Sequence, residues 1–317
     1  MEQYLLDFVY LAGGFLLLAK GADWLVGGSS GLARRWGISA LVVGLTVIAW
    51  GTSAPEVVVS TLASAEGKPG MAMGNVLGSN IANIGLVLGA CALVLPRVLE
   101  TAPRVRESFW LMASLGVLWW TVSDLSVDRA DGVLLLGVFA AYNLQLYISS
   151  RGGVKCEEAA KGPSGHYWRA VILGSISVAV GAKLVVLGAE NVALSFGISD
   201  RVIGLTVVAI GTSLPELAAG LGAAFKGESD VSLGNVIGSN VFNVLAVIGI
   251  AALVAPFDGS VPEVARELRH ARNEDFLIVV AFHAGAMLLP RVGGERFGRW
   301  KGLVFLGAYV WYSWQHF

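Results

Sequence analysis

Long apolar runs separated by short polar gaps fill almost the whole sequence. Each is about as long as the 20-residue helix that crosses a bilayer, and we count ten, near 4–26, 38–64, 71–95, 108–123, 132–149, 168–190, 201–225, 231–255, 275–290 and 301–316. Only 14% of the residues are charged, whereas a soluble globular chain carries about 25%. The sequence therefore predicts an all-α polytopic membrane protein with ten transmembrane helices.

This composition excludes several classes of protein. A soluble enzyme or a disordered chain needs more charged surface, and a net charge of −1 leaves no basic face for nucleic acid. The P-loop pattern GxxxxGK[ST] is missing, so no nucleotide is expected as a partner. The two cysteines, Cys91 and Cys156, do not form a disulfide framework or a metal cluster. The expected surroundings are the lipid bilayer of the cell membrane, and the sequence is compatible with a monomer.

Loop charges predict the orientation. If the N-terminus is outside, 14 of the 22 Lys and Arg residues fall in inside loops and six in outside loops, which agrees with the positive-inside rule. The gap 256–274 is discordant because it places three arginines outside. Both termini are predicted to lie outside.

An internal repeat is the most informative pattern. Shifting the chain by 160 residues aligns 41–90 with 201–250, and 22 of the 50 positions are identical. GTSAPE at 51–56 matches GTSLPE at 211–216, and GNVLGSN at 74–80 matches GNVIGSN at 234–240. Duplication kept for packing alone explains repeated glycine and leucine, but not the repeated Thr, Ser, Glu and Asn.

The two copies are expected to cross the membrane in opposite senses, because an odd number of segments separates them. The predicted organisation is a first half of five helices at 1–150, a short cytoplasmic linker at 151–167 and a second half at 168–317. The repeats occupy about 38–95 and 198–255. Inverted repeats with broken helices at the midplane are typical of secondary transporters, whose site lies between the copies.

Glu56 and Glu216 are the leading site candidates. A charge at the centre of a membrane helix costs about 3 kcal/mol on insertion scales, so two acids in equivalent places indicate function. Pro55 and Pro215 remove helix donors and are expected to break each helix, which frees carbonyl oxygens. Carboxylates, hydroxyls and carbonyls suit hard cations such as Ca²⁺ and Na⁺.

The next segments add further oxygen ligands. Ser79 and Asn83 are four residues apart and share one helix face, as do Ser239 and Asn243. Asn80 and Asn240 lie off that face, where a bond to the neighbouring broken helix is expected. Packing is an alternative role for any one of these side chains, whereas the symmetric set beside two glutamates favours coordination.

At these residues the chain resembles the cation/Ca²⁺ exchanger superfamily, and within it the prokaryotic sodium/calcium exchanger-like proteins. The resemblance covers nearly the whole chain and implies two inverted five-helix halves, with the first helix of each half sliding against the other eight. It also implies the transported ions, Ca²⁺ and Na⁺ bound at the midplane, with no other cofactor. The ligands it implies are Glu56, Glu216, Thr52, Thr212, Ser53, Ser213, Ser79, Ser239 and Asn83, with the backbone carbonyls of Ala49 and Ala209.

One position departs from the family pattern. Exchangers of this type commonly carry Asn in the first copy and Asp in the second, but here both Asn83 and Asn243 are amides. If the family's Asp stays protonated, Asn243 has nearly the same shape and little changes. If that Asp titrates, Asn243 has lost a group that can carry a proton. The departure bears on the stoichiometry, the pH dependence and the coupling ion.

The sequence thus predicts a Na⁺/Ca²⁺ antiporter that exports Ca²⁺ by alternating access, and not an enzyme. The alternative is a Ca²⁺/H⁺ or other divalent cation/H⁺ antiporter in which Glu56 and Glu216 carry protons. A channel is disfavoured because a midplane site with two acids holds an ion. An intramembrane enzyme would need a nucleophile with a base or a His-rich metal motif.

Overall fold

The computed structural model describes residues 2–94, 105–150, 164–196, 209–292 and 298–316. Within these ranges the chain is helical, and its only extended pairing is an isolated antiparallel bridge between Val127 and Phe257. The prediction of an all-helical protein is confirmed for the described residues.

The described residues of the first half form ten helical elements, several of which join into longer rods. In chain order they are α1 (Glu2–Trp36), α2 (Ala40–Val43), η1 (Gly44–Ile48), α3 (Ala49–Thr52), α4 (Ala54–Ala65), α5 (Pro69–Ala82), η2 (Asn83–Leu88), α6 (Gly89–Val94), α7 (Val105–Thr121) and α8 (Arg129–Ser150). The elements η1 and η2 are π-helical turns inside otherwise continuous helices.

The second half repeats this plan. Its described elements are α9 (Ser164–Ser195), α11 (Ala209–Thr212), α12 (Leu214–Phe225), α13 (Ser229–Phe242), η4 (Asn243–Val247), α14 (Ile248–Val254), α15 (Pro262–His270), η5 (Ala271–Asp275), α16 (Phe276–Leu288), η6 (Leu289–Arg291) and α17 (Arg299–His316). Helix α9 begins inside the range predicted as a linker, and 151–163 lies outside the described residues.

Several helices are long and apolar enough to cross a bilayer. In the described chain five single helices meet this standard, and a bent pair makes a sixth; they are Leu6–Trp36, Pro69–Val94, Arg129–Ser150, Gly165–Ser195, Ser229–Val254 and the pair Ala40–Thr52 with Ala54–Ala65. The remaining predicted segments are shorter helices or, as at 201–225, are described only in part. The protein is a multi-pass membrane protein, and the number ten stays a prediction.

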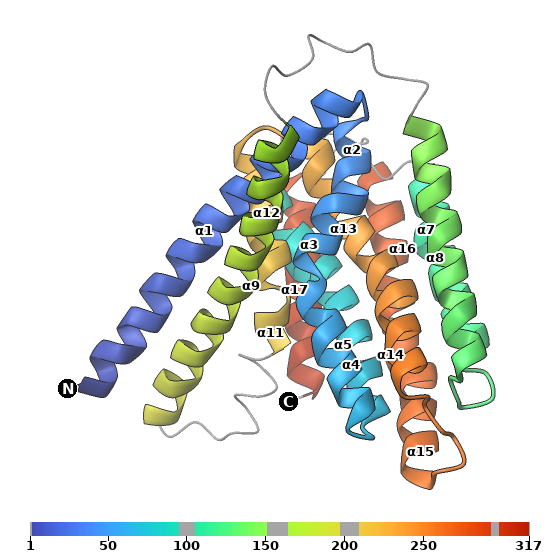
Figure 1. Ribbon diagram of the computed structural model, residues 1–317. Helices are drawn as coiled ribbons and strands as arrows, with labels where there is room; N and C mark the ends of the chain where they lie inside the picture. Colours follow the sequence, from blue (N-terminus) through green and yellow to red (C-terminus); the bar gives the residue numbers. More distant parts are fainter. Residues whose placement is uncertain (1, 95–104, 151–163, 197–208, 293–297, 317) are drawn as a thin grey trace.

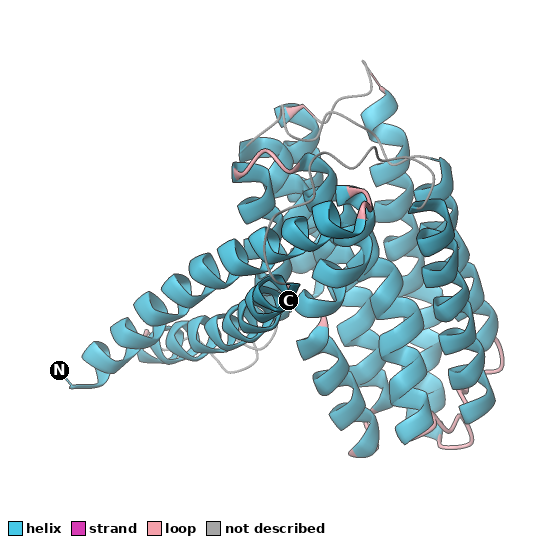
Figure 2. Ribbon diagram, turned by 45° about the horizontal axis from the view of Figure 1, so that its top comes forward, coloured by secondary structure: helices cyan, strands magenta, loops and turns pink. Residues whose placement is uncertain are grey.

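Helices α1 and α9 form a close antiparallel pair that projects from the rest of the molecule (Figures 1 and 2). Glycines line the contact: a Cβ on Gly14 would lie 2.8 Å from the Gly181 carbonyl oxygen, and one on Gly21 would lie 3.0 Å from that of Gly174. Such small residues let two helix backbones approach, which drives packing in a membrane where the hydrophobic effect cannot.

Helix α13 lies at the centre of the bundle, and every residue from Val231 to Phe242 is buried. It packs directly against η1, where a Cβ on Gly234 would lie 3.1 Å from the Cα of Gly44. This contact joins the second repeat to the helix that precedes GTS in the first repeat. The close packing therefore brings the two repeated motifs together.

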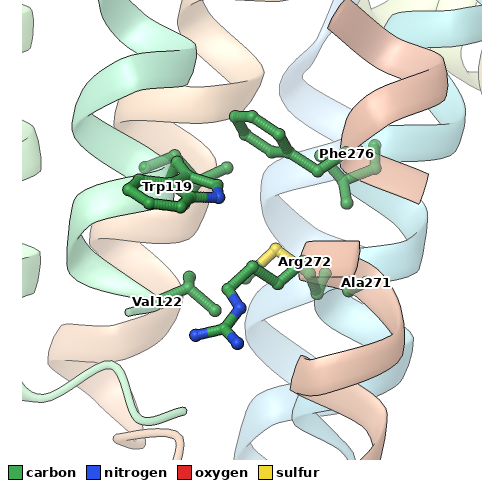
Figure 3. A pocket seen from close by; sticks show the side chains of 8 residues that line it. Trp119, Val122, Ala271, Arg272 and Phe276 are labelled. Atoms are coloured by element: carbon green, nitrogen blue, oxygen red, sulfur yellow. The ribbon is translucent and has the colours of Figure 1, made fainter. Parts of the chain in front are cut away.

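The gap 256–274, predicted as a loop, contains the amphipathic helix α15 and most of η5. Pro262 starts α15 and Arg269 and His270 end it, in agreement with helix capping preferences. Farther along, the Arg272 side chain extends toward α7 beside Trp119, at a cavity of about 10 Å³ (Figure 3), and its Nη1 donates to the Ser123 carbonyl at 2.7 Å. At least one discordant arginine therefore has a structural role.

Candidate cation-binding site

Glu56 and Glu216 occupy equivalent positions in the two repeats. Each lies in the first turn of a helix, α4 or α12, and each side chain is fully buried. The first turn of a helix favours negative charge because its backbone N–H groups are unpaired and the helix dipole is positive there. The backbone therefore supports two carboxylates that the surrounding protein shields from water.

The helix break predicted at each GTSxPE motif is present. Ser53 has φ −87° and ψ 9° and Ser213 has φ −93° and ψ 3°, so both lie between two helices rather than within one. The axes of Ala40–Thr52 and Ala54–Ala65 differ by 48°. Proline explains the break, because Pro55 has no N–H to donate to the Gly51 carbonyl.

Hydrogen bonds join the broken helix of the first repeat to the second repeat. Ser53 Oγ donates to Glu216 Oε1 at 2.8 Å. Thr52 Oγ1 donates to Asn235 Oδ1 at 3.2 Å and lies 3.5 Å from Ser239 Oγ. All of these side chains are buried or nearly so, and the candidate site therefore forms at the interface between the two copies.

The asparagines that follow bond to one another rather than to the broken helices. Asn80 Nδ2 donates to the Asn240 carbonyl at 3.2 Å, and Asn83 Nδ2 donates to Asn240 Oδ1 at 3.3 Å. The expectation that Asn80 and Asn240 bond the neighbouring broken helix is therefore wrong in this structure. They instead connect α5 and the start of η2 with α13, because these elements pack against each other across the repeat interface.

Seven side-chain oxygens of the predicted ligand set are buried and have no hydrogen-bond partner. They are Glu56 Oε1 and Oε2, Glu216 Oε2, Ser79 Oγ, Ser213 Oγ, Asn83 Oδ1 and Asn243 Oδ1. Leaving such an atom unpaired costs about 1–3 kcal/mol, and a bound cation would compensate this cost. Ser79 lies beside the Glu56 carboxyl, and Glu56 and Glu216 are close enough to repel each other. This set of oxygens fits a hard cation.

Three other predicted ligand positions lie in the short helices that precede the two breaks. The Ala49 carbonyl accepts the Ser53 N–H at 3.0 Å and lies 3.3 Å from the Thr52 hydroxyl, whose single hydrogen also has Asn235 Oδ1 within reach. Thr212 and Ala209 are the last and first residues of α11. Ala209 and Ala49 thus occupy equivalent places at the starts of the short helices that precede the two breaks.

Asn235 belongs to the network although the sequence assigned it no role. Its Oδ1 accepts from Thr52, and its Nδ2 donates to the Glu216 carbonyl at 3.3 Å. The repeat motif GNVxGSN contains this residue and offered a signal for it. Helical spacing could not place it, because the spacing argument considered only the face shared by Ser239 and Asn243.

The chemistry of these side chains argues against a transition-metal centre. In the part of the chain that the structure describes, no three His, Cys, Asp or Glu residues gather into a metal-binding group. Neutral hydroxyls and amides around two carboxylates suit Ca²⁺ or Na⁺, whereas zinc and copper prefer imidazole and thiolate.

The fold and these buried oxygens define a helical membrane protein with a candidate cation site between two homologous halves. The family model described as sodium/calcium exchanger protein matches residues 6–148 and 166–315. The chain belongs to the sodium/calcium exchanger family, within the cation/Ca²⁺ exchanger superfamily.

Similar proteins span nearly the whole chain. A putative antiporter CaxA of Alkalimonas amylolytica is 38% identical, with 96% of this chain and 97% of the relative covered. The sodium/calcium exchanger MaX1 of Methanosarcina acetivorans is 30% identical, with 96% of each covered. A structure of the sodium-calcium exchanger NCX_Mj soaked with Na⁺ and Sr²⁺ has a TM-score of 0.79 and 34% identity, over 96% of this chain and 97% of that one.

Proposed function

We propose that this protein is a Na⁺/Ca²⁺ antiporter of the cell membrane that exports Ca²⁺ by alternating access. The observation that carries the proposal is that seven buried oxygens of the predicted ligand set, three of them on Glu56 and Glu216, have no hydrogen-bond partner. Sodium entering downhill supplies the energy, since the sequence has no P-loop for ATP. The same oxygens bind either ion, so that Na⁺ and Ca²⁺ compete, and this competition produces exchange.

Charge balance supports Ca²⁺ and Na⁺ as the exchanged ions. Glu56 and Glu216 together neutralise one Ca²⁺ or two Na⁺, and the other proposed ligands are neutral: Thr52, Thr212, Ser53, Ser213, Ser79, Ser239, Asn83, Asn243 and the carbonyls of Ala49 and Ala209. The Ala49 carbonyl already accepts the Ser53 N–H next to the break. The Thr52 hydroxyl beside it can turn toward a cation.

The transport cycle that we propose uses ten membrane-spanning segments in two inverted halves. Two observations support opposite crossing directions. The α4–α5 hairpin lies at the lower end of the molecule in Figure 1, beside α15, and Gly70 N donates to Glu267 at 3.1 Å. The α12–α13 hairpin lies at the upper end, where Lys226 pairs with Asp23 of α1 at 3.1 Å. Sliding of the α1–α9 pair opens the site to either face, with both termini outside.

The deciding experiment is ⁴⁵Ca²⁺ uptake into proteoliposomes loaded with Na⁺, K⁺ or choline, followed by a pH gradient alone. We expect uptake only with internal Na⁺. Uptake driven only by the pH gradient would instead establish the Ca²⁺/H⁺ alternative. In that case Glu56 and Glu216 would carry the protons.

A further inference from the structure

The equivalent asparagines Asn75 and Asn235 make different contacts. Asn235 is fully buried and bridges two elements of the site, Thr52 in the first repeat and the Glu216 carbonyl in the second. Asn75 is only partly buried, and its Nδ2 donates instead to Ser60 Oγ at 2.9 Å, one turn along α4 from Glu56. One asparagine is therefore engaged at the site, and its counterpart is held away from it.

The carboxylates show the same asymmetry. Glu216 accepts from Ser53 of the other repeat at 2.8 Å. In the equivalent pair, neither Glu56 oxygen nor Ser213 Oγ has a hydrogen-bond partner. The first-repeat hydroxyl of Ser53 thus bonds to Glu216, whereas the second-repeat hydroxyl of Ser213 does not bond to Glu56, which lies beside Ser79 of its own repeat.

Two inverted copies allow this asymmetry to reverse, because each copy can adopt the conformation that the other has now. We propose that Asn235 and Asn75 are positioning residues that act in turn. Asn235 holds the site in the present conformation, and Asn75 leaves Ser60 for Thr212 and the Glu56 carbonyl in the conformation open to the opposite face. This inference rests on the alternating access proposed above and names the residues that stabilise each state.

Ser60 has a specific part in this exchange. It holds Asn75 away from the site, and the equivalent residue in the second repeat is Gly220, which has no hydroxyl. Removing the Ser60 hydroxyl frees Asn75 and favours the opposite state. Removing the Asn235 amide also shifts the equilibrium toward the opposite state, since it weakens the present one. Removing the Asn75 amide shifts the equilibrium toward the present state.

The test measures the two conformations directly. Spin labels are placed at Leu16 of α1 and Met71 of α5, both exposed, in a protein with Cys91→Ala and Cys156→Ser. Distances are recorded by double electron–electron resonance in liposomes for Asn235→Ala, Ser60→Ala and Asn75→Ala. Ser64→Ala is the matched control, because it removes another buried hydroxyl of α4 that bonds to the Ala255 carbonyl.

We expect Asn235→Ala and Ser60→Ala to change the ratio of the two distances about fivefold in one direction and Asn75→Ala about fivefold in the other, the factor for one net hydrogen bond. Ser64→Ala should leave the ratio unchanged. Shifts in the same direction for Asn75→Ala and Ser60→Ala, or one unchanged distance in every protein, would overturn the inference. If the ratios shift as expected but no gradient drives ⁴⁵Ca²⁺ uptake, the proposed cargo fails and the inference stands.

Discussion

At the scale of single residues, the chain concentrates its chemistry in two short motifs. Each GTSxPE motif contributes one buried acid at a helix start and two hydroxyls at the preceding break. Burial of two carboxylates is tolerated because backbone N–H groups and, for Glu216, the Ser53 hydroxyl stabilise them. The unpartnered oxygens nearby leave these acids available to a cation.

Replacing either acid should stop transport. Glu56→Gln and Glu216→Gln each remove one of the two carboxylates, so one negative charge remains for a divalent cation, and we expect ⁴⁵Ca²⁺ uptake to fall to that of protein-free liposomes. Both variants should still insert, because a neutral amide costs less in the membrane than an acid. Glu66→Gln is the control, since this exposed acid pairs with Lys68 at the α4–α5 hairpin. Wild-type uptake by both variants would refute the site.

The amide at Asn243 should remove a source of pH dependence. Asn243→Asp places a carboxyl that can gain or lose a proton at a buried position where the amide cannot. At acidic pH the new group is protonated and resembles the amide, so the variant should behave like the wild type. As pH rises the group ionises, and the apparent Ca²⁺ affinity should depart from that of the wild type. Uptake profiles that coincide from pH 6 to 9 would show that the substitution is silent.

At the scale of elements, breaks and close contacts matter more than helix length. The π-helical η2 and η4 begin with the equivalent residues Asn83 and Asn243, so the same local irregularity places both amides. Glycine contacts then fix how neighbouring rods approach, most clearly between α1 and α9. The element that we propose to slide is therefore one that packs through backbone rather than through large side chains.

Adjacent glycines of α1 provide a sharp comparison. A Cβ on Gly14 would lie 2.8 Å from the Gly181 carbonyl oxygen, whereas one on Gly13 would have no heavy atom within 4 Å. Gly14→Ala should therefore separate α1 from α9, destabilise the protein by about 1–3 kcal/mol and slow exchange. Gly13→Ala should be neutral or slightly stabilising, because alanine favours the helix. Melting temperatures in detergent measure the difference, and equal values would contradict the packing argument.

At the scale of the whole molecule, the two homologous halves pack against each other. The central helix α13 contacts the first repeat along its length, and bonds such as Ser53–Glu216 cross from one copy to the other. Neither half contains a complete site. The exchange between two conformations that we propose therefore involves both halves, because any movement of one changes the proposed ligands that it offers to the other.

Equivalent hairpins should face opposite sides of the membrane. Glu66 and Lys226 are related by the 160-residue shift and are both at least partly exposed. In cells carrying the Cys156→Ser protein, a membrane-impermeant maleimide should label Glu66→Cys from outside and should reach Lys226→Cys only after the membrane is opened. Labelling of both from the same side would exclude inverted topology, and the reversed pattern would place the termini inside.

The sequence by itself determined the class, the repeat and the position of the breaks. These follow from local causes: apolar runs long enough for a bilayer, a 160-residue self-match, and prolines that remove helix donors. Burial of Glu56 and Glu216 was predictable for the same reason, since each acid lies in the middle of an apolar segment. The short helix α15 was not predicted, because a charged amphipathic helix lacks the long apolar run used to find segments.

Only the tertiary structure decided which equivalent residues are engaged. Asn75 and Asn235 stand in the same motif, yet one holds Ser60 and the other bridges Thr52 and Glu216. Likewise Asn80 and Asn83 bond to Asn240, a partner 160 and 157 positions away. A sequence repeat makes two positions equivalent. When the two halves adopt different conformations, equivalent residues have different neighbours, because packing across the whole fold sets those neighbours.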